Sequence, residues 1–98
     1  MHLEESSIGD LKTRVRNRKP QYVGATDNYI RREQQHRSNY PERYKMYYAE
    51  TTNMQHAENR LLQICAEREG CRSNVQGTSN AAEARGFVYA IFSRSVPV

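Results

Sequence analysis

The strongest hydrophobic pattern in this sequence lies near its end, where FVYAIF forms a continuous apolar run. Such a run, bounded by turn-forming residues, predicts a strand that is buried on both faces. Two shorter runs predict further strands, and the longer stretches between the strands predict two helices. The strands are expected at residues 21–25, 43–50 and 87–92, and the helices at about 26–38 and 53–69. This order predicts a small α/β or α+β domain with a three-stranded sheet.

Short polar residues mark the expected starts of these two helices. Thr26 or Asp27 is expected to cap the first helix and Thr52 or Asn53 the second, because their side-chain oxygens accept hydrogen bonds from free backbone N–H groups. Gly70 is expected to end the second helix, as glycine commonly does. Polar, turn-forming segments predict loops at residues 39–42 and 71–86 and a loose tail after residue 93.

The segment before these elements is open to two interpretations. A thin apolar stripe at helical spacing predicts a helix over residues 6–18 with Ser6 or Ser7 as its N-cap. Between residues 11 and 16, however, basic residues alternate with apolar ones or threonine, which predicts a strand instead. Pro20 ends either element.

The composition indicates one domain with a thin, partly aromatic core. Only 37% of the 98 residues are hydrophobic, and there is no tryptophan. Seven tyrosines and two phenylalanines supply the aromatic surface. A tyrosine buries its ring while its hydroxyl keeps a polar contact, so this composition suits surfaces that belong partly to the core and partly to a binding site.

The charge of the chain favours a nucleic-acid partner. Fifteen Lys and Arg residues face eleven Asp and Glu residues, for a net charge of +4, and most of the basic residues are arginine. The planar guanidinium matches the geometry of phosphate oxygens. A cluster of cations near the N-terminus is expected to clamp nucleic acid with a steep salt dependence. The expected nucleic-acid-binding residues are Lys12, Arg14, Arg16, Arg18, Lys19 and Arg31.

Other features of the sequence bear on its location. No stretch of about 18 apolar residues is present, so no membrane span is expected. The start MHLEESS lacks the basic and apolar parts of a signal peptide. Cys65 and Cys71 match no strong zinc signature, and reduced thiols are the simplest interpretation, with a zinc site that also uses His56 as the alternative. Together these features predict an intracellular protein.

Glu58 is the most informative residue of the longer helix. At helical spacing it lies one turn from Leu61 and Leu62, inside or beside the apolar face. A carboxylate that faces a core must be paired, protonated or bound to a metal. The simpler interpretation is a salt bridge to Arg60 or Arg32, and the other is a ligand for a hard divalent cation.

The shorter helix carries Arg32 and His36 four residues apart, and therefore on one face. The simpler interpretation of RREQQHR is a solvent-exposed face. However, the same face continues to Tyr29, and the strand just before it contains Tyr22 and Gly24. A glycine at that place allows another chain or a phosphate to approach the backbone closely.

These positions share the spacing of one known family. In the GIY-YIG nuclease family, a Tyr-Ile-Gly strand is followed by an arginine ten residues after its tyrosine and by a histidine or tyrosine fourteen residues after it. A metal-binding glutamate on a later helix and an asparagine beyond it complete the pattern. Here YVG is followed by arginine and histidine at the same two spacings, so the chain resembles this family over residues 21–92. The matching residues are Tyr22, Val23, Gly24, Thr26, Arg32, His36, Glu58 in AENRLL and Asn74 in SNVQ, with Asn80 as the other candidate for the asparagine.

The other strand of the family motif, Gly-Ile-Tyr, is displaced in this chain. No tyrosine occurs in residues 1–20, whereas GFVYAIF at residues 86–92 resembles that strand, with Tyr89 in the tyrosine position. We therefore expect a circular permutation in which this strand comes last, or an exchange of strands in a homodimer. Permutation predicts that residues 21 and 92 lie close together. The resemblance implies an α+β fold whose small three-stranded antiparallel sheet has a permuted strand order and is flanked by helices.

The resemblance also implies a division of the chain and a function. Residues 21–93 would form the nuclease-like domain, after a basic helix or extension at residues 1–20 and before a tail at 94–98. The function would be that of a metal-dependent endonuclease that hydrolyses phosphodiester bonds in DNA, with RNA as another substrate class. The alternatives are a non-catalytic nucleic-acid-binding module on a similar fold and a protein-interaction domain that uses the tyrosine-rich strand at 44–48.

The roles of the site residues follow from the resemblance alone. Glu58 would hold one Mg²⁺ or Mn²⁺ ion, and Arg32 would neutralise charge on the phosphate. Tyr22 would act as the general base or orient the water, and His36 would take over that role or hold the hydroxyl of Tyr22 in line. Two further catalytic residues are implied, a tyrosine that positions a phosphate and an asparagine that orients the glutamate or the loop: Tyr89 and Asn74.

Overall fold

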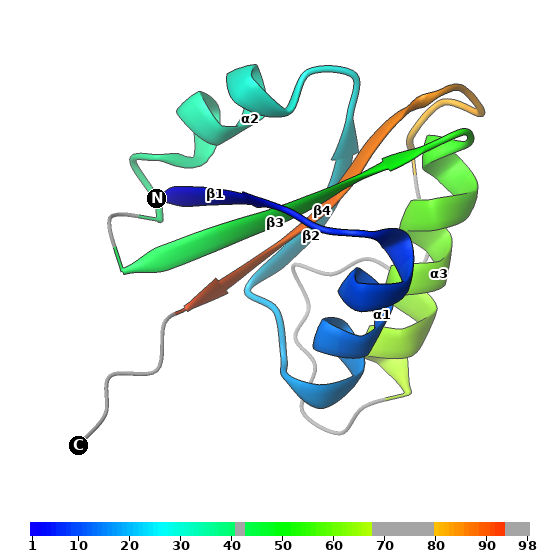
Figure 1. Ribbon diagram of the computed structural model, residues 1–98, viewed down its shortest axis with the longest axis horizontal. Coiled ribbons are helices and arrows are strands. Elements are labelled where there is room, and N and C mark those ends of the chain that lie inside the picture. Colours follow the sequence, from blue (N-terminus) through cyan, green and yellow to red (C-terminus); the bar gives the residue numbers. More distant parts are fainter. Residues whose placement is uncertain (41–42, 68–79, 94–98) are drawn as a thin grey trace.

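The apolar run near the C-terminus forms an inner strand of the sheet. In the computed structural model, which describes residues 1–40, 43–67 and 80–93, β4 (Gly86–Ser93) pairs antiparallel with β3 (Tyr44–Thr51) on one side and with β2 (Tyr22–Thr26) on the other. β1 (His2–Glu5) pairs in parallel with the far edge of β3. The sheet order is therefore β1-β3-β4-β2 (Figure 1).

The expected three antiparallel strands are present, but the sheet is larger than the sequence predicted. The fold is a small α+β domain with a four-stranded mixed sheet, because β1 adds a parallel edge strand. The residues of β1 are mostly exposed and show no apolar alternation that would mark a strand. β1 is held by backbone pairing and by an ion pair in which Lys45 Nζ lies 2.5 Å from Glu4 Oε1. A strand stabilised in this way leaves little trace in a hydrophobic pattern.

Pairing of the last strand with the first tyrosine-bearing strand is confirmed. Tyr22 lies opposite Ile91 and Gly24 opposite Tyr89 in the antiparallel register. The backbone N–H of Gln21 also donates to the carbonyl of Ile91 at 2.7 Å. The region around residue 21 therefore lies beside the end of β4, as the permuted order required.

Three helices are present in the described part of the chain: α1 (Ile8–Asn17), α2 (Tyr29–His36) and α3 (Met54–Ala66). The helical interpretation of the N-terminal segment is confirmed, with Ser7 as the N-cap of α1. Asn53 caps α3, as one of its two predicted residues. Gly70 lies outside the described residues.

The predicted cap of α2 is wrong by one residue. Asn28 caps the helix, because its side chain accepts a hydrogen bond from the N–H of Arg31 at 3.0 Å. Thr26 instead accepts from the N–H of Asn28 at 3.1 Å and so fixes the turn before the cap. Thr51 and Asn53 repeat this arrangement at the start of α3. A Thr-x-Asn sequence therefore joins strand to helix at both places.

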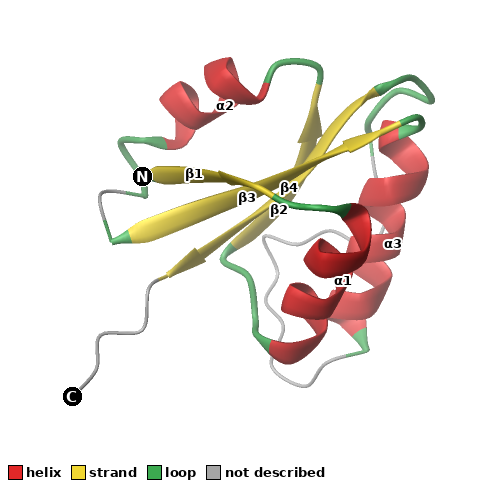
Figure 2. Cartoon of the chain, in the orientation of Figure 1, coloured by secondary structure: helices red, strands yellow, loops and turns green. Residues whose placement is uncertain are grey.

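The two faces of the sheet bury different kinds of side chain. Successive residues of β4 alternate between the faces. Val88 and Ala90 pack in an aliphatic cluster with α1 and α3, whereas Tyr89 and Ile91 pack in an aromatic cluster with residues of α2. Figures 1 and 2 show α1 and α3 together on one side of the sheet and α2 on the other.

The aromatic face explains how so polar a helix is held. The rings of Tyr29 on α2 and Tyr48 on β3 stack with their centroids 3.9 Å apart. A hydrogen bond with Tyr29, helped by burial, raises the pKa of Tyr48 to about 12. Glu33 is also buried, and Arg37 donates to its carboxylate at 3.0 and 2.5 Å. Aromatic stacking therefore anchors α2 to the sheet in place of aliphatic residues, whereas the Glu33–Arg37 pair stabilises the helix itself.

Two further expectations concern cysteine and the membrane. Cys65 is disulfide-bonded and fully buried, so the expectation of two reduced thiols is wrong for this residue. Cys71, the other cysteine of the sequence, lies outside the described residues. Within the described ranges, no helix has the length and apolar character needed to cross a membrane, in agreement with the sequence.

Candidate active site

The buried hydroxyl of Tyr89 is the centre of the candidate site. Tyr89 lies on the inner strand β4 and is 0% exposed. The hydroxyl end of its side chain lies over Gly24 on the neighbouring strand. A Cβ atom added to Gly24 would lie 2.5 Å from the Tyr89 hydroxyl oxygen. The sequence predicted a close approach at this glycine, and the approaching group is a tyrosine of the same chain. Glycine is needed here for space, not for an unusual backbone angle.

Tyr89 joins two predicted site residues from different elements. Its hydroxyl lies 2.9 Å from Nε2 of His36, at the end of α2. It also forms a hydrogen bond with Tyr22 of β2, whose ring stacks on that of Tyr89 at 6.0 Å between centroids. The rings of Tyr22 and His36 lie 4.7 Å apart. Residues 22, 36 and 89 therefore form one cluster, which is called the tyrosine–histidine cluster below.

The pKa of Tyr89 shows which charges lie near this cluster. Burial is the main cause that raises it far above the ordinary value, and Tyr22 adds to the increase. The guanidinium of Arg32 acts in the opposite direction, and the carboxylate of Glu58 raises the pKa further. A charge on α2 and a charge on α3 therefore both act on one buried hydroxyl, although these helices cover opposite faces of the sheet.

His36 is adapted to be neutral at neutral pH. Burial lowers the pKa of its imidazole below 6.5, and the positive charge of Arg32 lowers it further. A neutral imidazole can accept a proton, whereas a protonated one cannot. His36 therefore has the protonation state that a general base needs.

The pH dependence of the free energy of unfolding should reveal the lowered pKa of His36. In the unfolded chain a histidine binds its proton near pH 6.5, but in the folded protein it does so only at lower pH. Between the two pKa values the unfolded state binds more protons, so the free energy of unfolding rises with pH through this window. Replacing His36 by glutamine is expected to flatten the rise. Urea midpoints measured between about pH 5 and about pH 7.5 test this.

The control for this experiment is His56→Gln, because His56 is an exposed histidine on α3. That variant should keep the pH dependence of the unmodified protein. If His36→Gln and the unmodified protein show the same dependence, His36 does not titrate as the structure indicates.

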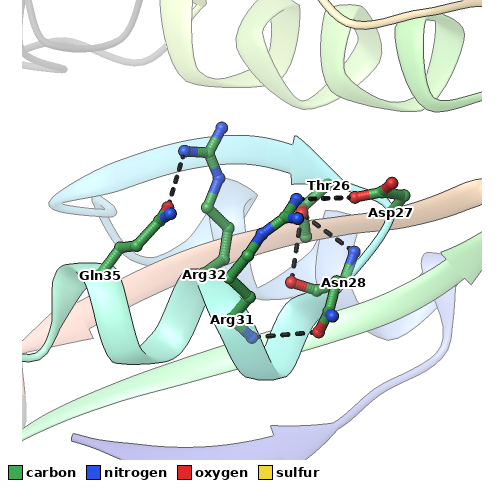
Figure 3. Close-up of polar contacts among 6 residues, drawn as sticks. All are labelled: Thr26, Asp27, Asn28, Arg31, Arg32 and Gln35. Atoms are coloured by element: carbon green, nitrogen blue, oxygen red, sulfur yellow. Dashed lines mark hydrogen bonds and ion pairs between the residues drawn. The ribbon is translucent and has the colours of Figure 1, made fainter.

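The two neighbouring arginines of α2 point in different directions, as Figure 3 shows. Arg32 is half-buried and donates from Nη1 to Gln35 Oε1 at 3.2 Å, one turn further along the helix. Arg31 is exposed and pairs with Asp27 at 3.0 Å. Only Arg32 acts on the cluster, and the predicted nucleic-acid contact of Arg31 would have to form on the outer surface of α2.

Glu58 is half-buried in the second turn of α3, beside the apolar face as the helical spacing predicted. In the ranges that the structure describes, no group of three or more His, Cys, Asp and Glu side chains could hold a metal ion. Any cation at Glu58 would therefore take most of its ligands from water and phosphate. This fits the way Mg²⁺ usually binds, through one or two carboxylates.

The structure separates the basic N-terminal residues from the cluster. α1 packs through Leu11 and Val15 on the aliphatic face of the sheet, opposite the aromatic face that holds Tyr89. The predicted cations of this segment therefore belong to the part of the chain that covers the face opposite Tyr89; they are Lys12, Arg14, Arg16, Arg18 and Lys19. Asn74, the last predicted catalytic residue, lies outside the described residues.

The role expected of Tyr89 needs a correction. A fully buried side chain cannot touch a phosphate directly, so Tyr89 is not a phosphate-positioning residue in this structure. Sequence reasoning also missed Glu33 and Tyr40. Glu33 sits four residues before Arg37, a spacing that could have indicated their pairing. The ring of Tyr40 lies 5.8 Å from that of His36, for which the sequence held no signal.

Comparison of the chain with protein-family models, with curated proteins and with solved structures found no match in any of the three.

Proposed function

We propose that this protein is a metal-dependent endonuclease that hydrolyses phosphodiester bonds in DNA. One observation carries the proposal: His36 and Tyr22, from different elements, contact the buried side chain of Tyr89, and the charges of Arg32 and Glu58 lie near enough to shift the pKa of its hydroxyl. These are the residue types that phosphodiester hydrolysis requires, namely a base, a cation for the phosphate and a carboxylate for a metal. The resemblance of the sequence to GIY-YIG nucleases supports the same function.

The antiparallel pairing of β2 and β4 supports the finer part of the fold proposal. Tyr22 and Tyr89 come from opposite ends of the chain, yet their strands are neighbours and their rings stack. A GIY-YIG-like domain with its first strand moved to the C-terminus would have this arrangement. We propose this permuted order as the reason why the motif is split in the sequence.

The cluster can move a proton away from an attacking water. Tyr22 is half-exposed, whereas Tyr89 behind it is fully buried. Water would give a proton to the oxygen of Tyr22, whose own proton would pass to Tyr89, and the proton of Tyr89 would pass to Nε2 of His36. The resulting hydroxide attacks phosphorus, the P–O ester bond breaks, and the leaving oxygen takes a proton from solvent. His36 is thus the final base, and Tyr89 connects it to the surface.

Arg32 and Glu58 would act on the phosphate during this step. The guanidinium of Arg32 neutralises charge that develops on the nonbridging oxygens. Glu58 is the residue that would hold a divalent cation, which when bound supplies Lewis-acid polarisation of the phosphate. Because Glu58 would supply only one carboxylate, water and phosphate oxygens would supply the other ligands, as they commonly do for Mg²⁺.

Nicking of supercoiled plasmid tests this function directly. We expect the unmodified protein to produce open-circular DNA in the presence of Mg²⁺ or Mn²⁺, and we expect EDTA to abolish the reaction because the metal is required. DNA binding measured in EDTA serves as the control, because it shows that removal of the metal stops cleavage without stopping binding. Binding without nicking in either metal, over a range of salt concentrations, would leave only the non-catalytic nucleic-acid-binding module.

A further inference from the structure

A hollow lies between α1 and the sheet, on the face opposite the tyrosine–histidine cluster. Its volume is about 450 Å³, and it is open to solvent on one side. The residues that matter for its chemistry come from one side of α1 and from the adjacent strands: Thr13, Arg14, Asn17, Arg18, Tyr47 and Phe92. Arginines, a hydroxyl and an amide therefore surround a space of nucleotide size that the proposed cleavage reaction does not use.

Both arginines are held in place by aromatic rings. The guanidinium of Arg14 lies 4.1 Å from the ring centroid of Tyr47, and that of Arg18 lies 5.9 Å from the centroid of Phe92. A guanidinium that rests on a ring keeps its N–H groups free at its edge. Less side-chain entropy is then lost when these groups bind a ligand.

The neighbouring acidic groups neutralise these arginines only in part. Glu4 lies 3.8 Å from Arg14, but it makes its shorter contact, 2.5 Å, with Lys45. Asp10 also lines the hollow, so two arginines face one carboxylate there. The side chain of Arg14 remains 43% exposed. The hollow thus keeps a positive charge with several hydrogen-bond donors.

We propose that this hollow binds the phosphodiester backbone of DNA as a second site, separate from the site of cleavage. The inference rests on the proposed function for its choice of nucleic acid, and it names a second contact of the same substrate. Fixed guanidinium groups match phosphate oxygens, and the side-chain amide of Asn17 adds a further donor. Because the hollow and the cluster lie on opposite faces of the sheet, they hold different segments of the DNA.

The test compares two double variants of the full chain by fluorescence anisotropy with a labelled oligonucleotide in EDTA. Arg14→Gln/Arg18→Gln removes the two arginines of the hollow. Arg43→Gln/Arg85→Gln removes the same charge at exposed positions that do not line the hollow and for which no nucleic-acid contact is expected. We expect the first pair to weaken binding about 30-fold or more, and the second by less than about 5-fold.

The salt dependence gives a second readout. Loss of two phosphate contacts should reduce the slope of log affinity against log salt by about 2 for Arg14→Gln/Arg18→Gln. Arg14→Lys/Arg18→Lys keeps the positive charges but not the planar guanidinium groups, and this variant should bind DNA with intermediate affinity. Equal losses in the hollow pair and the control pair would overturn the inference, because binding would then depend on net charge alone.

The outcome can be separated from that of the proposed function. If plasmid is not nicked but DNA binding depends on Arg14 and Arg18, the nuclease proposal fails and the binding site stands. If plasmid is nicked and the hollow pair binds like the control pair, the binding site fails and the nuclease proposal stands. Inorganic phosphate that competes with the oligonucleotide only in proteins with an intact hollow would add direct support.

Discussion

Replacing Glu58 by glutamine is expected to reduce the rate of plasmid nicking by about 10³-fold or more. Glutamine has nearly the same shape as glutamate but carries no charge, so it holds a hard divalent cation much more weakly. Glu58 lies in the second turn of α3 at a half-buried position, so the neutral amide should leave the helix intact. The carboxylate also acts on Tyr89, whose pKa it raises. The rate measured in Mg²⁺ at saturating DNA checks this expectation.

Glu50→Gln is the matched control, because Glu50 is an exposed carboxylate on β3. We expect that variant to nick plasmid at the unmodified rate. Both variants should bind DNA in EDTA as well as the unmodified protein does. If the Glu58→Gln protein retains nicking, Glu58 does not hold the metal that the reaction requires.

The second large effect is expected for Gly24→Ala. The added Cβ would lie 2.5 Å from the hydroxyl oxygen of Tyr89 and 2.6 Å from its Cζ, well inside van der Waals contact. The ring of Tyr89 is fully buried, so it cannot move aside without disturbing its contact with His36. Overpacking of this kind costs about 1–3 kcal/mol of unfolding free energy. We therefore expect a lower urea midpoint together with loss of nicking.

Gly9→Ala gives the matched control for this change. Gly9 lies in α1, and a Cβ added there meets nothing within 4 Å. Alanine at such a helical position should stabilise the protein by about 0.5–1 kcal/mol. If Gly24→Ala is as stable as Gly9→Ala, the close approach between β2 and Tyr89 is not present in solution.

The sequence predicted most of the fold through its hydrophobic periodicity. The inner strand β4, the strands β2 and β3 and the helices α2 and α3 follow from apolar runs and polar helix starts, whereas α1 was one of two interpretations that the sequence left open. β1 was missed because an edge strand held by backbone pairing and an ion pair needs no apolar face. The cap at Asn28 was missed because Thr26 and Asp27 are equally good capping residues, and only the turn geometry selects among them.

The candidate site was predictable only in part. The spacing of Tyr22, Arg32 and His36 identified two residues that the structure brings to Tyr89, Tyr22 and His36, and a third, Arg32, whose charge lowers the pKa of that tyrosine. The continuous apolar run predicted that the strand of Tyr89 is buried on both faces, but a strand pattern does not say which helices cover each face. The position of the N-terminal cations on the opposite face depends on the packing of α1 against α3, which requires the whole core.

Arg32 and Glu58 are proposed to act on the same phosphate, although their helices cover opposite faces of the sheet. The most direct test is the nicking rate of Arg32→Gln/Glu58→Gln, beside the two single variants and Arg60→Gln/Glu58→Gln. Arg60 is the matched control for Arg32, because each donates to a glutamine three residues later, at 3.1 and 3.2 Å. Groups that act as a unit give non-additive losses, so Arg32→Gln/Glu58→Gln should be no more than about threefold slower than Glu58→Gln alone. Losses that multiply would show that the two residues act independently and would contradict a shared site.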